Sequence, residues 1–127
     1  LLIATAAVWL SDTAAWGLGH LFGRTKLAPR LSPNKTVEGA LAGGVTALLA
    51  VIAFGSWAGL PLPHGLALGL LVAVFSQIGD AAESVIKRDL GIRDFGTVVG
   101  PHGGFLDTFD GVLFAAPVTW FYLYFLL

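Results

Sequence analysis

Two aspartates near the C-terminal apolar segment have the spacing of a metal site. Asp107 and Asp110 are three residues apart, so a helix places both on one face. Carboxylates this close repel each other unless a cation or a basic group lies between them, and their oxygens suit hard divalent cations. The pair therefore predicts metal ligands at the entrance to the last apolar segment. A pair of surface aspartates, stabilised by the dipole at a helix N-terminus, is the alternative.

A second group of polar residues precedes this pair in the sequence. Helical spacing places Asp80, Glu83, Ser84 and Lys87 on one face. A glycine-rich turn at 100–104 follows, and its backbone N–H groups are available to bind an anion. These residues indicate a surface for metal and phosphate, although a solvated helix end with internal ion pairs has the same pattern.

A third motif, at 32–39, lies between the first two apolar segments. Ser32 or Thr36 is expected to cap the helix that follows. A helix N-terminus that also carries Lys35 and hydroxyl groups is a favourable phosphate site. The motif is not a Walker A loop, because the glycines that precede the lysine are missing.

Asp12 stands inside an otherwise apolar stretch. An ionisable group in a membrane span is costly, and it usually marks a functional site with a partner nearby. A hydrated position where the helix reaches the membrane surface explains Asp12 equally well.

The elements that must position these residues are apolar. The 127 residues are 56% hydrophobic and 12% charged, with a mean hydropathy of +0.81, which a soluble core of this size does not accommodate. The sequence predicts an all-α, polytopic integral membrane protein with about four transmembrane helices. The third is short unless its helix continues through Asp80 and Glu83. The four apolar segments are 1 to about 22, 40 to about 60, 65 to about 78, and 111–127.

The charged residues predict the orientation of these helices. All seven lysines and arginines lie in the connections 24–38 and 81–110, whereas the connection 56–64 has none. Two spans separate the basic connections, so both face the same side, and the positive-inside rule makes that side cytoplasmic. We therefore expect two cytoplasmic catalytic loops. The small residues of 39–47 favour close helix packing, and the absence of cysteine excludes disulfides and thiolate ligands.

Three motifs together resemble those of one enzyme family. The longest comprises Ser84-Val-Ile-Lys87-Arg88, Arg93-Asp94, His102-Gly103-Gly104, Asp107 and Asp110. It is similar to the signature of phosphatidate cytidylyltransferases, the CDP-diacylglycerol synthases. The segments 12–23 and 32–39 resemble two further motifs of that family, in the expected order. The resemblance covers nearly the whole chain, so 1–127 is expected to be the C-terminal catalytic part of a larger membrane-embedded protein. Thr108 stands where the family usually has Arg.

The resemblance implies that the phosphate of phosphatidic acid attacks the α-phosphorus of CTP, giving CDP-diacylglycerol and pyrophosphate with Mg²⁺ as cofactor. It implies catalytic roles for Asp80, Lys87, Asp107 and Asp110. We expect Asp107 and Asp110 to be the main metal ligands, with Asp80 or Asp12 as a further one. The expected substrate-binding residues are Ser32, Lys35, Thr36, Glu38, Ser84, Arg88, Arg93, Asp94, His102, Gly103 and Gly104.

The implied partners are CTP, phosphatidic acid and the lipid bilayer, with no nucleic acid and with a homodimer as an option. The implied location is the cell inner membrane or an equivalent membrane, with the site facing the cytoplasm. Three alternatives stay open: a CTP-dependent enzyme acting on another lipid phosphate, an ion-coupled transporter, and an inactive paralogue suggested by Thr108. A transporter would distribute acids across the membrane depth, whereas seven of the eight acids here lie in or beside the basic connections.

Overall fold

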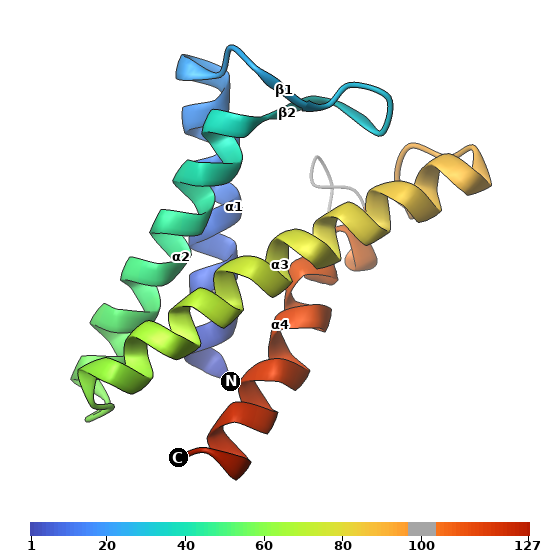
Figure 1. The fold of residues 1–127 in the computed structure, drawn as a ribbon. Coiled ribbons are helices and arrows are strands. Elements are labelled where there is room, and N and C mark those ends of the chain that lie inside the picture. The colour runs from blue at the N-terminus through green and yellow to red at the C-terminus, as the bar shows by residue number, and fades with distance from the viewer. Residues whose placement is uncertain (97–103) are drawn as a thin grey trace.

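The computed structural model describes residues 1–96 and 104–127. Four long helices dominate these residues, and a short hairpin joins the first two (Figure 1). The helices are α1 (Leu2–Phe22), α2 (Val37–Trp57), α3 (Leu62–Leu90) and α4 (Phe105–Phe125), and the strands are β1 (Lys26–Ala28) and β2 (Ser32–Thr36).

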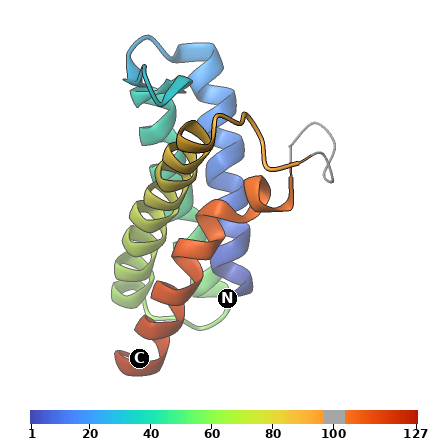
Figure 2. The same cartoon turned by 90° about the vertical axis from the view of Figure 1, so that its right-hand side faces the viewer.

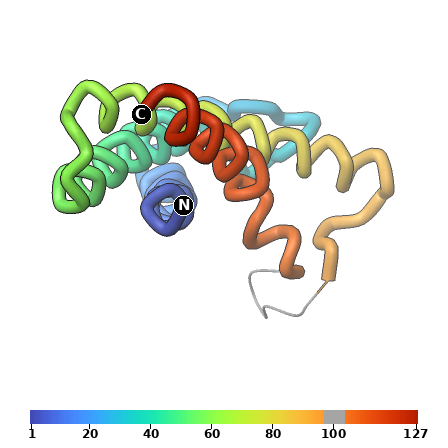
Figure 3. Tube along the Cα trace, turned by 90° about the horizontal axis from the view of Figure 1, so that it is seen from below, coloured from blue at the N-terminus to red at the C-terminus, as the bar shows by residue number. Residues whose placement is uncertain are grey.

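The helices alternate in direction. The hairpin, the C-terminal end of α3 and the start of α4 lie toward one end of the bundle, as Figures 1 and 2 both show. Figure 3 looks onto the opposite end, where α1 begins, α2 connects to α3, and α4 ends. The polar motifs of the sequence are therefore gathered toward one end.

Two of the described helices, α2 and α3, are long and apolar enough to cross a membrane. The predicted membrane-protein class agrees with this finding and with the predominantly helical fold. Helix α3 resolves the question of the short third segment, because it continues for 29 residues and carries Asp80 and Glu83 within it. Gly91 ends it in the left-handed conformation, with φ of 68°, and the Ile92 N–H bonds to the Lys87 carbonyl.

The hairpin is a short β element that the sequence did not predict, within a fold that is otherwise helical as expected. Strands β1 and β2 pair in antiparallel fashion, with Lys26 opposite Thr36 and Ala28 opposite Ser32. Strands of three and five residues interrupted by Pro33 give no alternating pattern to recognise, so the sequence indicated only a loop. Tertiary contacts hold the hairpin in place instead: the Glu38 carboxylate accepts the backbone N–H groups of Arg24 and Thr25.

Small residues set the distance between α1 and α2, as the sequence predicted. A Cβ on Gly39 would lie 2.7 Å from the Ala15 carbonyl oxygen, and one on Gly43 would lie 3.0 Å from the Ser11 carbonyl oxygen. Thr36 caps α2 by accepting the Gly39 N–H at 3.1 Å, which confirms one of the two predicted caps. The buried core that joins all four helices consists largely of small and branched side chains, Val8, Val51, Val72 and Ala115 among them. The helices can therefore approach closely because the residues between them are small.

Candidate active site

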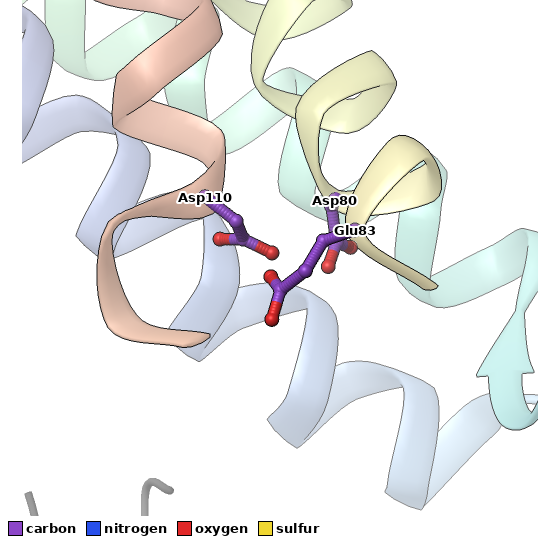
Figure 4. A group of neighbouring side chains, drawn as sticks. All are labelled: Asp80, Glu83 and Asp110. Carbon is purple, nitrogen blue, oxygen red and sulfur yellow. The ribbon is translucent and has the colours of Figure 1, made fainter. Parts of the chain in front are cut away.

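Three carboxylates meet where α3 and α4 come together. Oxygen atoms of Asp80, Glu83 and Asp110 lie within 4.8 Å of one another. Figure 4 shows the side chains of Asp80 and Glu83, from α3, and that of Asp110, from α4, directed toward a common point. Glu83 and Asp110 are buried, at 6% and 9% exposure. This is a set of hard oxygen donors in a geometry that suits a divalent cation such as Mg²⁺.

Asp80 and Asp110 line a cavity of about 530 Å³, whose wall combines charged and apolar residues. Its wall is formed by α1, the hairpin, α2, α3 and the first turns of α4, and it includes Asp12, Lys35, Asp80, Asp107 and Asp110. The sequence had placed these residues in separate motifs. The fold brings them to one cavity because both polar connections lie at the same end of the bundle.

Negative charge dominates the described part of this site. Five carboxylates lie in or beside the cavity: Asp12, Asp80, Glu83, Asp107 and Asp110. Two of the lysines contact them. Buried carboxylates that outnumber their ammonium partners repel one another, so a divalent cation would stabilise the arrangement.

Lys35 carries positive charge from the hairpin into the cavity. Its Nζ forms an ion pair with the Asp80 carboxylate and donates to the Ser84 hydroxyl at 3.5 Å. Strand β2 ends one residue later at Thr36, whose cap fixes the start of α2, so the position of Lys35 is set by both elements. Lys35 lines the cavity beside the carboxylates and is available to contact a phosphate there.

Lys87 joins α3 to α4. Its Nζ lies 2.9 Å from Glu83 Oε1 and 2.5 Å from Asp107 Oδ1, and the two carboxylates are 6% and 5% exposed. Asp107 Oδ2 accepts the backbone N–H groups of Phe95 and Gly104, at 2.9 and 2.6 Å. The Asp107 carboxylate therefore fixes the start of α4, and Asp110 rather than Asp107 belongs to the compact group of three.

Other predicted residues occupy the periphery. Arg88 donates from Nε to the Leu31 carbonyl oxygen at 2.8 Å, which ties the hairpin turn to α3. Ser32 and Thr36 line the cavity, Glu38 holds the hairpin, and Arg93 and Asp94 are exposed after α3. Thr108 bonds back to the Gly104 carbonyl. His102 and Gly103 lie outside the described residues, whereas Gly104 caps α4.

Several residues in or beside the cavity were not predicted from the sequence to belong to the site. Glu83 was recognised as part of the helix face but not as a member of the site, although its spacing from Asp80 was a usable signal. Gln77 lines the cavity and donates to the Ala40 carbonyl oxygen at 2.9 Å. Trp16 and His20 line it from α1. Both lie in the segment 12–23, whose resemblance to a family motif was the available signal.

Gly79 controls how closely α3 and α4 approach at the carboxylates. A Cβ at this position would lie 2.7 Å from the Asp110 carbonyl oxygen and 3.0 Å from Phe114 Cδ2. We expect Gly79→Ala to separate the helices and to lower the free energy of unfolding by about 1–3 kcal/mol, as overpacking typically does. Thermal unfolding in mild detergent measures the effect.

The matched control is Gly17→Ala, also within a helix, where a Cβ meets no atom within 4 Å. Both changes gain the same intrinsic helix propensity, so their difference isolates the steric cost. Equal melting temperatures for the two variants would show that the contact at Gly79 is not tight.

Comparison with known proteins shows which family this chain resembles. A model of the cytidylyltransferase family matches residues 1–126. The phosphatidate cytidylyltransferase of Bacillus subtilis (strain 168) is 43% identical over 126 residues, covering 98% of this chain and 45% of the relative. That of Aquifex aeolicus (strain VF5) is 44% identical over 128 residues, covering 97% and 46%. That of Synechocystis sp. (strain ATCC 27184 / PCC 6803 / Kazusa) is 41% identical over 130 residues, covering 99% and 43%.

The chain thus spans about half the length of the curated relatives that it matches. The residues of this chain that are matched include Lys35, Asp80, Glu83 and Asp110. On the strength of the family match over nearly its whole length, the chain belongs to the cytidylyltransferase family.

Proposed function

We propose that this chain forms the catalytic part of a membrane enzyme that transfers the cytidylyl group of CTP to phosphatidic acid. The observation that carries the proposal is the grouping of Asp80, Glu83 and Asp110 beside Lys35 in a cavity of about 530 Å³. The names of the relatives support the choice of substrates. A CTP-dependent enzyme for another lipid phosphate is the nearest alternative.

In the proposed reaction a phosphate oxygen of phosphatidic acid attacks the α-phosphorus of CTP. The bond from that phosphorus to the oxygen bridging it to the β-phosphorus breaks, and pyrophosphate leaves with the bonding electrons. Such a transfer depends on alignment and on neutralisation of phosphate charge more than on covalent help from the protein. The cavity wall contains carboxylates, Lys35 and hydroxyl groups, which are the groups needed to align the phosphates and neutralise their charge.

Asp80, Glu83 and Asp110 would hold Mg²⁺, with Asp107 and Asp12 on the adjoining wall. The fit rests on oxygen atoms of three carboxylates within 4.8 Å of one another and on the burial of Glu83 and Asp110, at 6% and 9% exposure. A bound Mg²⁺ would spread the negative charge of the reacting phosphates and orient them. Lys35 would bind phosphate as a point charge, and Ser84 would position its ammonium group.

We further propose that all four helices cross the membrane and that the hairpin end faces the cytoplasm. Helices α1, α2 and α4 have 21 residues each, enough to span about 30 Å of hydrocarbon at 1.5 Å per residue. The lysines and arginines lie in the hairpin and at the junction of α3 and α4, as expected for the cytoplasmic side. A nucleotide from the cytoplasm and a lipid headgroup at the interface would then reach the same cavity.

Incorporation of radiolabelled CTP into lipid tests the function. The full-length protein is reconstituted with phosphatidic acid, and labelled CDP-lipid is expected only when Mg²⁺ is present. Parallel vesicles that carry a polyprenyl phosphate instead of phosphatidic acid serve as the substrate control. Labelling of the polyprenyl phosphate alone would support the alternative substrate, and no labelling from a folded, inserted protein would contradict a cytidylyltransferase.

A further inference from the structure

An aromatic pair on α1 lines the same cavity as the carboxylates. Asp12, Trp16 and His20 follow one another at intervals of four residues, so they share one face of the helix, and all three line the cavity. The rings of Trp16 and His20 stack, with centroids 5.6 Å apart and an interplanar angle of 27°. Trp16 is nevertheless 72% exposed, so its indole ring remains available to a ligand.

The other tryptophan of α1 is placed differently. Trp9 packs edge-on against Phe109 of α4, with ring centroids 5.7 Å apart, and contributes to the contact between these helices. Trp16 has its stacking partner on its own helix, which leaves the indole on the cavity wall. An exposed aromatic ring beside a polar cavity suits a ligand that itself has a flat π-face.

Trp16 shares its cavity with the charged residues proposed to bind metal and phosphate. One helical turn, about 6 Å along the axis, separates Trp16 from Asp12. Lys35 pairs with Asp80 and both line this cavity, so phosphates bound at Lys35 would share the cavity with the indole ring. We infer that the Trp16–His20 pair is the platform on which the pyrimidine ring of the nucleotide stacks.

This inference rests on the proposed function and adds a base subsite to it. His20 acts as a positioning residue, because its ring lies against the indole and limits its rotation. Stacking tolerates any base with a π-face, so the platform contributes affinity for a nucleotide without choosing between pyrimidines. An interfacial anchor for the membrane is the competing role of an exposed tryptophan.

The test compares Trp16→Ala, Trp16→Phe and Trp57→Ala in the reconstituted full-length protein. Trp16→Ala is expected to raise the KM for CTP roughly tenfold or more, the typical effect of losing one base–aromatic stack. The KM for phosphatidic acid and the inhibition constant of inorganic tripolyphosphate, which has no base, are expected to stay unchanged. Trp16→Phe keeps a π-face and should retain most of the affinity for CTP.

Trp57→Ala is the matched control for a membrane anchor. Trp57 is the last residue of α2 and is 90% exposed. Helix α2 ends at the end of the bundle opposite the hairpin (Figure 1). An unchanged KM for CTP in Trp16→Ala would overturn the base subsite. A rise in the KM for phosphatidic acid in both Trp16→Ala and Trp57→Ala would also overturn it, because that result would identify Trp16 as a membrane anchor.

Direct binding separates this inference from the proposed function. CTP binding is expected to quench the tryptophan fluorescence of the wild type. Most of that quenching is expected to be absent in Trp16→Phe. Quenching at Trp16 without cytidylyl transfer would support the subsite and contradict the function. Transfer by the wild type with no quenching at Trp16 would overturn the subsite alone, and no binding of CTP would overturn both.

Discussion

Replacement of Asp110 by Asn is expected to lower Mg²⁺-dependent turnover by more than about 100-fold, because loss of a direct ligand exceeds the 10- to 100-fold effect of losing an outer one. Carboxylate oxygens of Asp110, Asp80 and Glu83 lie within 4.8 Å of one another. Replacing the Asp110 carboxylate by an amide removes one negative charge with little change in the shape of the side chain. The Mg²⁺ concentration for half-maximal activity should rise in parallel. Both quantities follow from incorporation of labelled CTP into lipid across a range of Mg²⁺ concentrations.

Two further variants make this result specific. Asp89→Asn changes an exposed acid near the end of the same α3 helix and is expected to behave as wild type. Asp107→Asn should chiefly destabilise the start of α4, since this carboxylate binds Lys87 and two backbone N–H groups. Normal Mg²⁺ activation in Asp110→Asn would remove this residue from the proposed metal site. Loss of Mg²⁺ activation in a stable Asp107→Asn would instead return Asp107 to the role of main ligand.

Replacement of Lys87 by Met is expected to reduce the free energy of unfolding by about 3–5 kcal/mol, the usual cost of removing one partner from a buried ion pair. The ammonium group lies between Glu83 and Asp107, both nearly buried, and without it two like charges remain side by side. The contact between α3 and α4 should weaken first. Thermal unfolding in detergent measures the loss, with Lys26→Met, an exposed lysine of β1, as the control.

A double-mutant cycle identifies the origin of this cost. If the unpaired Asp107 carboxylate causes the destabilisation, Lys87→Met combined with Asp107→Asn should be more stable than the sum of the two single effects predicts. We expect a coupling energy of about 1–3 kcal/mol, as found for residues within one charge network. Additive effects would mean that Lys87 does not stabilise the start of α4 through Asp107.

Much of the site could be predicted from residue spacing alone. Intervals of three residues placed Asp80 with Glu83, and Asp107 with Asp110, on helix faces, because the periodicity of a helix is independent of what packs against it. The position of Lys35 just before a helix also followed from local signals, and Thr36 forms the predicted cap. The described parts of the two basic connections lie toward one end of the bundle, as the two helices between them require, whereas the cytoplasmic location of that end stays a prediction.

The pairing of side chains between elements required the tertiary structure. Spacing could not show that Lys87 binds Asp107, 20 residues later, or that Arg88 holds the hairpin turn, because such contacts depend on how the helices cross. The hairpin itself was missed, since its strands are too short to carry a periodic pattern and are held by Glu38 and Arg88.

The sequence by itself thus determined the apolar helices and the identity of the polar motifs, because hydropathy and helical periodicity are local properties of the chain. Only the tertiary structure decided which carboxylates meet. It grouped Asp110 with Asp80 and Glu83 and assigned Asp107 to the start of α4. The physical reason is the close approach of α3 and α4 at Gly79, which brings these side chains to one point and leaves Asp107 beside Lys87.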